Sequence, residues 1–386
     1  MNQYFRKTPL AWRQLVKQKA RIAVALAGIA FADILMFVQM GLLDSLYDSA
    51  TAPHRALQAD LVVLNPQTKT LIDLLSFSKR RLYQTLGHEA VVSVSPLYVG
   101  TAPWRNPETR ISRSILIFGI DPLRSPFSFL THPAQLDSLN LLSRGLFDQK
   151  SRPEYGPIAD LLAQGTVKTE VNKKAFQAVG LFDLGASFGA DGNVVTSHST
   201  FLNLFSDRQP SQIDIGLVQL APTAEATVVQ DQLRSSLPTD VQILTKAEFV
   251  QLEKKYWADG GTGFIFNMGT VVGFIVGTVI VYQILYTDVS DHLPEYATLK
   301  AIGYSDRYLI GVLAQEVVIL AVLGFIPGFI ASLGIYQLTS AATALPVVMK
   351  TSRALNVFAL TVVMCGASGL IAMQKLRSAD PADVFA

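Results

Sequence analysis

Long apolar runs dominate the pattern of the chain. Four of them, Ile22–Leu43, Gly263–Tyr286, Ile310–Tyr336 and Leu355–Met373, reach the roughly 20 residues that a helix needs to cross a bilayer. We therefore predict four membrane-spanning helices, called spans one to four in chain order. The third run is long enough to tilt or bend, and we expect any bend at Pro327.

Basic residues before span one predict the orientation. No acidic residue accompanies them, and Lys and Arg close to a span favour the cytoplasmic side. We expect a multi-pass protein of the inner (plasma) membrane with both termini in the cytoplasm and segment 44–262 outside. Span one is longer than the apolar core of a signal peptide, and no A-x-A site follows it, so we expect a retained anchor. Two basic residues in the outer loop before span four, Lys350 and Arg353, are exceptions to the rule. The residues that set the orientation are Arg6, Lys7, Arg13, Lys17, Lys19 and Arg21.

Segment 44–262 mixes strand and helix patterns and is long enough for one or two packed domains. A β-rich insertion is expected near Gly180–Asn203, and stalk segments are expected at Asp44–Ser49 and at the end of the domain. The predicted fold class is an α-helical membrane protein with four transmembrane helices and a large α+β extracytoplasmic (periplasmic) domain between the first and the second. Strands are expected at Ala59–Asn65, Val91–Gly100, Ile115–Asp121, Ile213–Leu220 and Val241–Leu244, and helices at Glu225–Leu237 and Ala247–Trp257.

A polar island, Ser290–Gly311, separates spans two and three. Pro294 suits the first turn of a helix and Gly303 suits its C-cap. A short cytoplasmic helix rooted in two spans could receive a push from a docked partner, because its surface mixes charged and apolar side chains. A solvated connector is the open alternative. The candidate docking residues are Leu293, Pro294, Glu295, Tyr296, Ala297, Leu299, Lys300, Ile302 and Gly303.

The segments together predict one linear order. The N-terminal arm carries Trp12, Leu15 and Val16 on one helical face and cationic heads on the other, which suits the inner membrane surface and its anionic lipids. The order is a cytoplasmic amphipathic helix (1–21), span one (22–43), the extracytoplasmic domain with stalk segments (44–262), span two (263–286), a cytoplasmic coupling loop (287–309), span three (310–336), an outer loop (337–354), span four (355–373) and a cytoplasmic tail (374–386).

Small residues in the spans predict helix packing. Glycines spaced by four form a ridge that allows close approach of another helix, either in a second copy or in the same chain. Asp33 in span one is an ionisable group at membrane depth, and we favour an interhelical hydrogen bond over ion or proton transport. Glu316 is expected nearer the cytoplasmic interface. The predicted packing residues are Gly269, Gly273, Gly277, Gly324 and Gly328.

Composition and motifs exclude several function classes. Half of the residues are hydrophobic, 16% are charged and the net charge is +2, so nothing suggests nucleic-acid binding. The single cysteine, Cys365, allows no intramolecular disulfide and is expected to be a buried hydrophobe. No P-loop or H-E-x-x-H motif occurs, and the serine-rich Ser197–Thr200 is expected to be a loop and not a nucleophile. We predict no catalytic residue, no metal and no cofactor.

The sequence EYATLKAIGYSDRYLIGVLAQEVVILAVLGFIPG resembles the corresponding motif of FtsX/MacB-type permeases of ABC transporters. KLRSADPADVF, with Arg377 and Asp380–Ala382, resembles the closing motif of that family, and Ile117–Pro122 resembles a strand and turn of its periplasmic core domain. The opening AWRQLVKQKARIAVALAGIAFADILMFVQMGL looks more specifically like DevC, the permease of cyanobacterial DevBCA-type exporters.

The resemblance implies a homodimeric permease that transmits motion. A separate ABC ATPase would bind the coupling helix, a periplasmic membrane-fusion adaptor would dock on the external domain, and a TolC-like outer-membrane channel would continue the path. DevC-like systems are linked to glycolipid export. The alternative is an FtsX-like signalling scaffold that regulates a cell-wall hydrolase. An ion-coupled carrier ranks below both, because four spans without an internal repeat match such carriers poorly.

Overall fold

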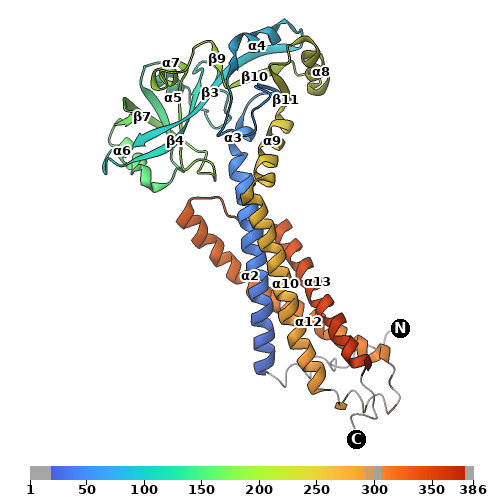
Figure 1. Ribbon diagram of the computed structural model, residues 1–386. Coiled ribbons are helices and arrows are strands. Elements are labelled where there is room, and N and C mark those ends of the chain that lie inside the picture. Colours follow the sequence, from blue (N-terminus) through green and yellow to red (C-terminus); the bar gives the residue numbers. More distant parts are fainter. Residues whose placement is uncertain are drawn as a thin grey trace. The chain divides into compact units, whose positions relative to one another are not determined.

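The computed structural model describes residues 19–292, 294, 295, 298, 302, 304 and 306–378 (Figure 1). The chain divides into two compact units. We call residues 1–44, 264–340 and 347–386 the membrane unit, and residues 45–263 and 341–346 the sheet unit. All the strands in the described residues belong to the sheet unit.

Four helices in the described residues are long and apolar enough to cross a membrane: α2 (Lys19–Ala50), α10 (Gly261–Asp291), α12 (Asp306–Thr343) and α13 (Thr351–Ser378). The sheet unit lies between the first and the second in sequence, so the predicted fold class is confirmed. The structure gives α12 as one helix that runs through Pro327. The helices satisfy their backbone hydrogen bonds internally, which is what the hydrocarbon interior of a bilayer requires.

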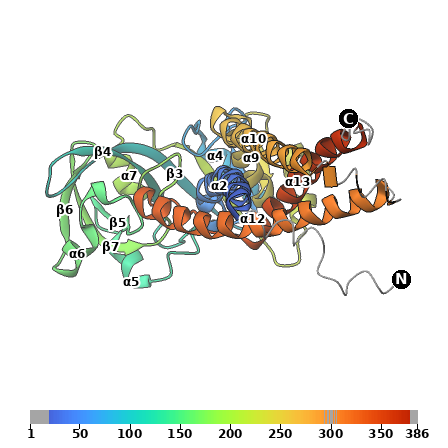
Figure 2. The same ribbon diagram turned by 90° about the horizontal axis from the view of Figure 1, so that it is seen from below.

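The membrane unit is organised around α2. Figure 2 views α2 nearly end-on and shows α10, α12 and α13 around it. The buried cluster of this unit takes Ala25, Ile29 and Ala32 from α2 and adds residues from the other three helices, including Leu285 and Cys365. Cys365 is a free, buried thiol, as predicted.

The sheet unit contains a nine-stranded sheet in the order β11-β1-β10-β3-β4-β8-β5-β7-β6. Neighbouring strands are antiparallel, except for the parallel pairs β4–β8 and β5–β7. The strands are β1 (Leu61–Leu64), β3 (Val91–Arg105), β4 (Ser112–Ile120), β5 (Arg144–Asp148), β6 (Val167–Val171), β7 (Lys174–Phe182), β8 (Asn193–Ser197), β10 (Ile215–Leu220) and β11 (Gln242–Thr245).

Short helices and a small second sheet complete the unit. A two-stranded sheet pairs β2 (Phe77–Ser78) with β9 (Gln212–Ile213). The helices are α3 (Ala52–Ala56), α4 (Lys79–Gln84), α5 (Pro133–Ser138), α6 (Ile158–Ala163), α7 (His198–Leu204), α8 (Ala226–Ser236) and α9 (Lys246–Asp259), with 3₁₀ turns η1 (Thr85–Gly87) and η2 (Pro153–Tyr155).

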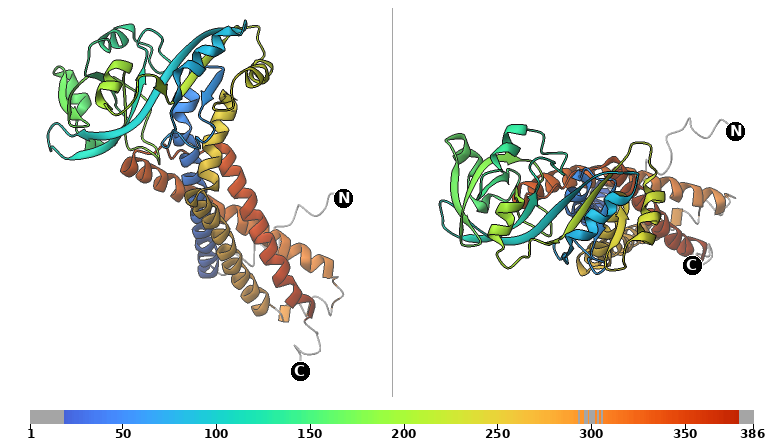
Figure 3. Two further views of the ribbon diagram at one scale, coloured as in Figure 1. Left: turned by 45° about the horizontal axis from the view of Figure 1, so that its top comes forward. Right: turned by 90° about the horizontal axis from the view of Figure 1, so that it is seen from above.

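Strand β3 joins the two halves of the large sheet (Figure 3). Its residues up to Leu97 pair with β10, and its residues from Tyr98 onward pair with β4. The prediction ended this strand at Gly100, but the strand continues to Arg105. Gly100 does not break it, because Gly100 lies against the ring of Phe205, where a Cβ would come within 3.0 Å of the ring.

Both faces of the sheet are buried. In β4, Ile115 and Ile117 belong to one hydrophobic core, whereas Leu116 and Phe118 belong to the other. Because successive side chains of a strand point to opposite faces, a strand with two buried faces reads as an unbroken apolar run. The predicted strands at β1, β4, β10 and β11 and the predicted helices at α8 and α9 are confirmed.

Residues Ser197–Thr200 do not form the predicted loop. Ser197 ends β8 and is the N-cap of α7, and its hydroxyl accepts a hydrogen bond from the Thr200 backbone N–H at 3.3 Å. A serine at this position satisfies a backbone donor that the first helical turn leaves free. His198 Nε2 lies 3.0 Å from the Pro96 carbonyl oxygen, and burial lowers the pKa of His198 to about 4. These side chains therefore hold the strand-to-helix junction together.

A buried carboxylate links α9 to the segment after β1. The Glu253 side chain is 3% exposed and accepts hydrogen bonds from Thr70 Oγ1 (2.9 Å), the Leu71 backbone N–H (2.8 Å) and Trp257 Nε1 (2.8 Å). His54 Nε2 of α3 lies 3.4 Å from Glu253 Oε2. Burial raises the pKa of Glu253, but His54 and these donors outweigh burial, so the pKa lies below its usual value.

We expect Glu253→Gln to destabilise the full chain in detergent by about 1–3 kcal/mol at neutral pH, since an amide offers one acceptor oxygen to these donors. A pKa depressed in the folded state stabilises fully above the unfolded pKa of about 4.3, and this contribution is lost as the pH falls through the folded pKa. The difference between wild type and variant, measured by thermal unfolding, should therefore shrink in acid. The exposed Glu89→Gln is the control. A difference that is the same at pH 7 and at low pH would contradict this role for Glu253.

Candidate functional site

The described residues between Pro294 and Tyr304, in the predicted coupling segment, are exposed. Pro294, Glu295 and Thr298 are helical, and the Thr298 hydroxyl donates to the Pro294 carbonyl oxygen at 2.8 Å. Ile302 is in a turn, with its backbone N–H 3.1 Å from the Thr298 oxygen and its side chain 72% exposed. The other predicted docking residues, Leu293, Tyr296, Ala297, Leu299, Lys300 and Gly303, lie outside the described residues.

The three predicted packing glycines of α10 face α2. A Cβ added to Gly277 would come within 2.6 Å of the Ala32 Cβ, and one added to Gly273 would lie 3.3 Å from the Leu35 Cβ. A Cβ at Gly269 would overlap the Gln39 side chain. The absence of side chains here lets the two helices approach closely, so this ridge contacts a span of the same chain.

The two predicted packing glycines of α12 also face α2. A Cβ at Gly324 would lie 2.6 Å from Ile29 Cγ2, and one at Gly328 would lie 2.8 Å from the Asp33 Cβ. Sequence reasoning missed a glycine on α2 itself, Gly28, where a Cβ would lie 2.5 Å from Ile280 Cγ2. The small residues of α2 recur at helical spacing through Ala25, Gly28 and Ala32, which is the signal that could have revealed it.

Asp33 makes the interhelical hydrogen bond that its position predicted. It is fully buried, and its Oδ1 accepts a hydrogen bond of 2.5 Å from the Thr361 hydroxyl on α13. Glu316, the other acidic side chain singled out in the spans, is 4% exposed on α12. Asp33 therefore connects α13 to α2, the helix that the glycines of α10 and α12 contact.

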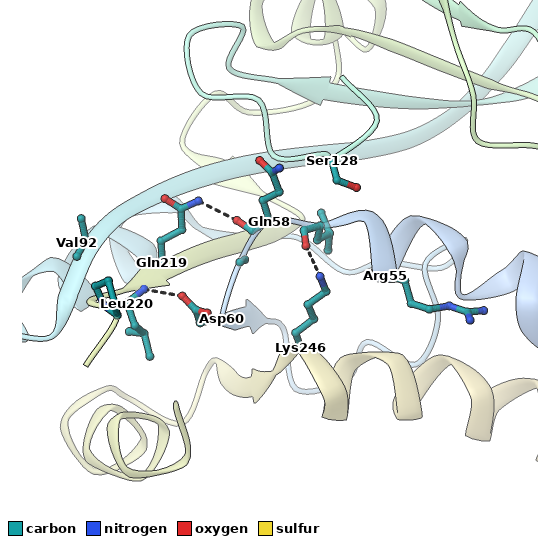
Figure 4. Close-up of a pocket in the computed structure, with 11 residues that line it drawn as sticks. Arg55, Gln58, Asp60, Val92, Ser128, Gln219, Leu220 and Lys246 are labelled. Atoms are coloured by element: carbon teal, nitrogen blue, oxygen red, sulfur yellow. Dashed lines mark hydrogen bonds between the residues drawn. The ribbon is translucent and has the colours of Figure 1, made fainter. Parts of the chain in front are cut away.

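The sheet unit offers a cavity of about 580 Å³ beside the start of α9 (Figure 4). Three of its polar side chains have partners within the protein. Gln219 Nε2 donates to the Gln58 carbonyl oxygen at 3.0 Å, Lys246 Nζ donates to the Leu57 carbonyl oxygen at 2.5 Å, and Asp60 Oδ2 accepts from the Leu220 backbone N–H at 2.8 Å. These contacts fix the segment between α3 and β1 to the sheet, which is a structural role.

No group of three or more His, Cys, Asp or Glu side chains that could hold a metal ion occurs in the described ranges. The arrangement that distinguishes the membrane unit is a set of glycine contacts and hydrogen bonds that hold three helices on α2.

We expect Gly277→Ala and Gly324→Ala each to lower the stability of the full chain by about 1–3 kcal/mol, because each added methyl group would overlap a rigid Cβ or Cγ of α2. Gly334→Ala is the matched control, since no atom lies within 4 Å of its added Cβ. Thermal unfolding in detergent measures the difference. If all three variants unfold at the same temperature, the glycines do not set the helix spacing.

Comparisons with known proteins point to one class. Residues 267–381 match the family model described as FtsX-like permease C-terminal. Uncharacterised ABC transporter permeases of Mycobacterium bovis and of Mycobacterium tuberculosis are 25% identical over 252 residues, which cover 60% of this chain and 67% of theirs.

Two solved structures are similar to part of the chain. The periplasmic region of MacB from Actinobacillus actinomycetemcomitans gives a TM-score of 0.36 at 14% identity, covering 51% of this chain and 94% of that one. The extracellular domain of the ABC-type transporter YknZ from Gram-positive bacteria gives 0.31 at 12% identity, covering 48% and 98%. The sequence matches carry the likeness: residues 267–381 are similar to the FtsX-like permease C-terminal family, and the similar proteins include ABC transporter permeases.

Proposed function

We propose that this chain is the permease subunit of an ABC-type tripartite exporter. It couples ATP hydrolysis by a separate ATPase to a conformational change in its extracytoplasmic domain. The observation that carries the proposal is the FtsX-like match over residues 267–381, which includes the whole predicted coupling loop, 287–309. The similarity to ABC transporter permeases supports a partnership with a separate ATPase. The sequence has no P-loop of its own.

The order of elements along the chain supports a mechanical role. The sheet unit is inserted between α2 and α10, and α2 continues past the unit boundary to Ala50. At the other end, α9 stops at Asp259 and α10 begins at Gly261. A displacement of these two helices therefore reaches the sheet unit through the backbone, without a substrate channel.

The resemblance to DevC extends the proposal to the partners. A homodimer would sit in the inner membrane with its termini and coupling loop in the cytoplasm. A periplasmic membrane-fusion adaptor would dock on the sheet unit, and a TolC-like channel would carry the cargo onward. The cargo class that this resemblance suggests is a glycolipid.

A second function uses the same architecture. The matched family model is FtsX-like, so a transmembrane scaffold that regulates a cell-wall hydrolase is the alternative. Affinity purification from membranes separates the two. Co-purification of an adaptor with a coiled-coil hairpin supports export, whereas co-purification of a peptidoglycan hydrolase supports the scaffold.

We expect Leu299→Asp to abolish co-purification of the ATPase while leaving membrane insertion intact, because a charge would replace an apolar docking side chain. Thr298→Asp is the matched control, as it puts the same charge at a neighbouring exposed position that is already polar. Recovery of the ATPase at wild-type yield with Leu299→Asp would count against docking at this segment.

A further inference from the structure

A second cavity of the sheet unit, of about 270 Å³, adjoins the one in Figure 4, and both are lined by Gln58 and Gln219. Its walls come from separate parts of the unit: the segment between α3 and β1, strands β3 and β10, and the turn after β4. The larger cavity falls within the range of about 300–1,000 Å³ that is typical of small-molecule sites, and the smaller one lies just below it.

Several polar side chains of the smaller cavity are bonded within the protein. The Ser93 hydroxyl donates to Gln219 Oε1 at 2.7 Å, and Gln219 Nε2 donates to the Gln58 carbonyl oxygen at 3.0 Å. The Ser125 hydroxyl donates to the Phe127 carbonyl oxygen at 3.3 Å. These contacts fix the walls before any ligand arrives, which lowers the cost of ordering them on binding.

Three other polar side chains of this cavity have no partner among the described residues. Ser95 Oγ, on β3, is buried and makes no hydrogen bond. The Gln58 side-chain amide and the Arg124 guanidinium make no hydrogen bond or ion pair with another described residue. Asp121, the acidic residue nearest to Arg124 in sequence, accepts from the Leu123 backbone N–H at 3.0 Å. Buried polar groups are usually satisfied, so a cavity that gathers these three groups calls for a bound partner.

The three groups match a ligand that combines a negative charge with hydroxyl groups. A guanidinium offers planar, paired donors to the oxygens of a carboxylate or a phosphate. The Gln58 amide and the Ser95 hydroxyl can each donate and accept, which suits the hydroxyl groups of a sugar or another polyol.

The charges around both cavities favour a ligand with one negative charge. In the larger cavity, Arg55 is paired with Asp48 at 3.3 Å, and the charges of Lys246 and Asp60 balance. No acidic side chain is among the described residues that line the smaller cavity. Arg124 therefore supplies the one uncompensated charge, and complementary charge at a site favours the correct ligand over others.

We propose that the smaller cavity binds an anionic polyol, with the negative group on the Arg124 guanidinium and hydroxyl groups on the Gln58 amide and Ser95 Oγ. A free sugar acid and the polyol headgroup of an anionic lipid present this same chemistry. The site goes beyond the proposed function, because it holds whether the chain belongs to an exporter or to a signalling scaffold.

Isothermal titration calorimetry on the full chain, in a detergent without a sugar headgroup, tests the site. The probes are glucuronate, glucose, acetate and a short-chain phosphatidylinositol, whose headgroup is a polyol with one negative charge. We expect a Kd of about 1 mM or tighter for glucuronate or for the phosphatidylinositol, and the tighter of the two identifies a free or a lipid-borne ligand. Glucose lacks the charge and acetate lacks the hydroxyl groups, so each should bind at least about tenfold more weakly.

Arg124→Gln should weaken binding of the anionic polyol by about tenfold or more, because charge-assisted hydrogen bonds are lost. Arg80→Gln is the matched control and should leave the affinity unchanged, since Arg80 is also exposed and lines neither cavity. Ser95→Ala separates binding from folding. It should weaken binding by about fivefold without lowering the unfolding temperature, because the hydroxyl that it removes is buried without a partner.

Failure of both glucuronate and the phosphatidylinositol to bind overturns the proposal and leaves the proposed function standing. Glucose or acetate binding as tightly as the better anionic probe also overturns it. Equal affinities of Arg124→Gln and Arg80→Gln would place the ligand elsewhere. A lower unfolding temperature for Ser95→Ala would contradict the assignment of its hydroxyl to a ligand, since it would show that the hydroxyl supports the fold.

Discussion

Close contact with α2 is the interaction on which the membrane unit depends. Inside a bilayer the hydrophobic effect does not drive helices together, so association depends on tight packing and a few hydrogen bonds. The glycines of α10 and α12 face α2, and α13 reaches it through Thr361 and Arg353. Because α2 is also the helix that continues into the sheet unit, the same element organises the membrane helices and begins the sheet unit.

The sheet unit is built to remain in one piece. Strand β3 pairs with β10 along one half and with β4 along the other, so a single strand carries both halves of the sheet. Two hydrophobic cores cover the two faces, and the buried Glu253 connects α9 to the segment after β1. A unit braced in this way can transmit a displacement of its helices without unfolding locally, which is what the proposed function asks of it.

The sequence predicted those elements whose pattern is local. Spans follow from uninterrupted apolar length, and β1, β4 and α8 follow from apolar runs or helical periodicity. The extension of β3 past Gly100 did not follow, because the aromatic rings that fill the space beside Gly100 come from a distant segment. Ser197–Thr200 was predicted to be a loop because it is rich in serine. The role of Ser197 as a helix cap depends on α7 starting immediately after β8, which the local sequence does not reveal.

The candidate site could be predicted only in part. The spacing of Gly269, Gly273 and Gly277 predicted a packing surface, but periodicity within one helix cannot say which helix it meets. Arg353 looked like an exception to an orientation rule, since its partner Asp44 is distant in sequence. The role of the coupling residues in binding an ATPase remains a prediction. That role requires the sheet unit and the coupling segment to lie on opposite sides of one membrane.

That arrangement is the central claim, and cysteine accessibility tests it most directly. The chain has one native cysteine, so Leu123→Cys in the sheet unit (82% exposed) and Thr298→Cys in the coupling segment can each be introduced into a Cys365→Ala background. A membrane-impermeant maleimide is applied to intact spheroplasts and to permeabilised ones. The account predicts labelling of Leu123→Cys in both and of Thr298→Cys only after permeabilisation. Labelling of Thr298→Cys in intact spheroplasts would contradict it.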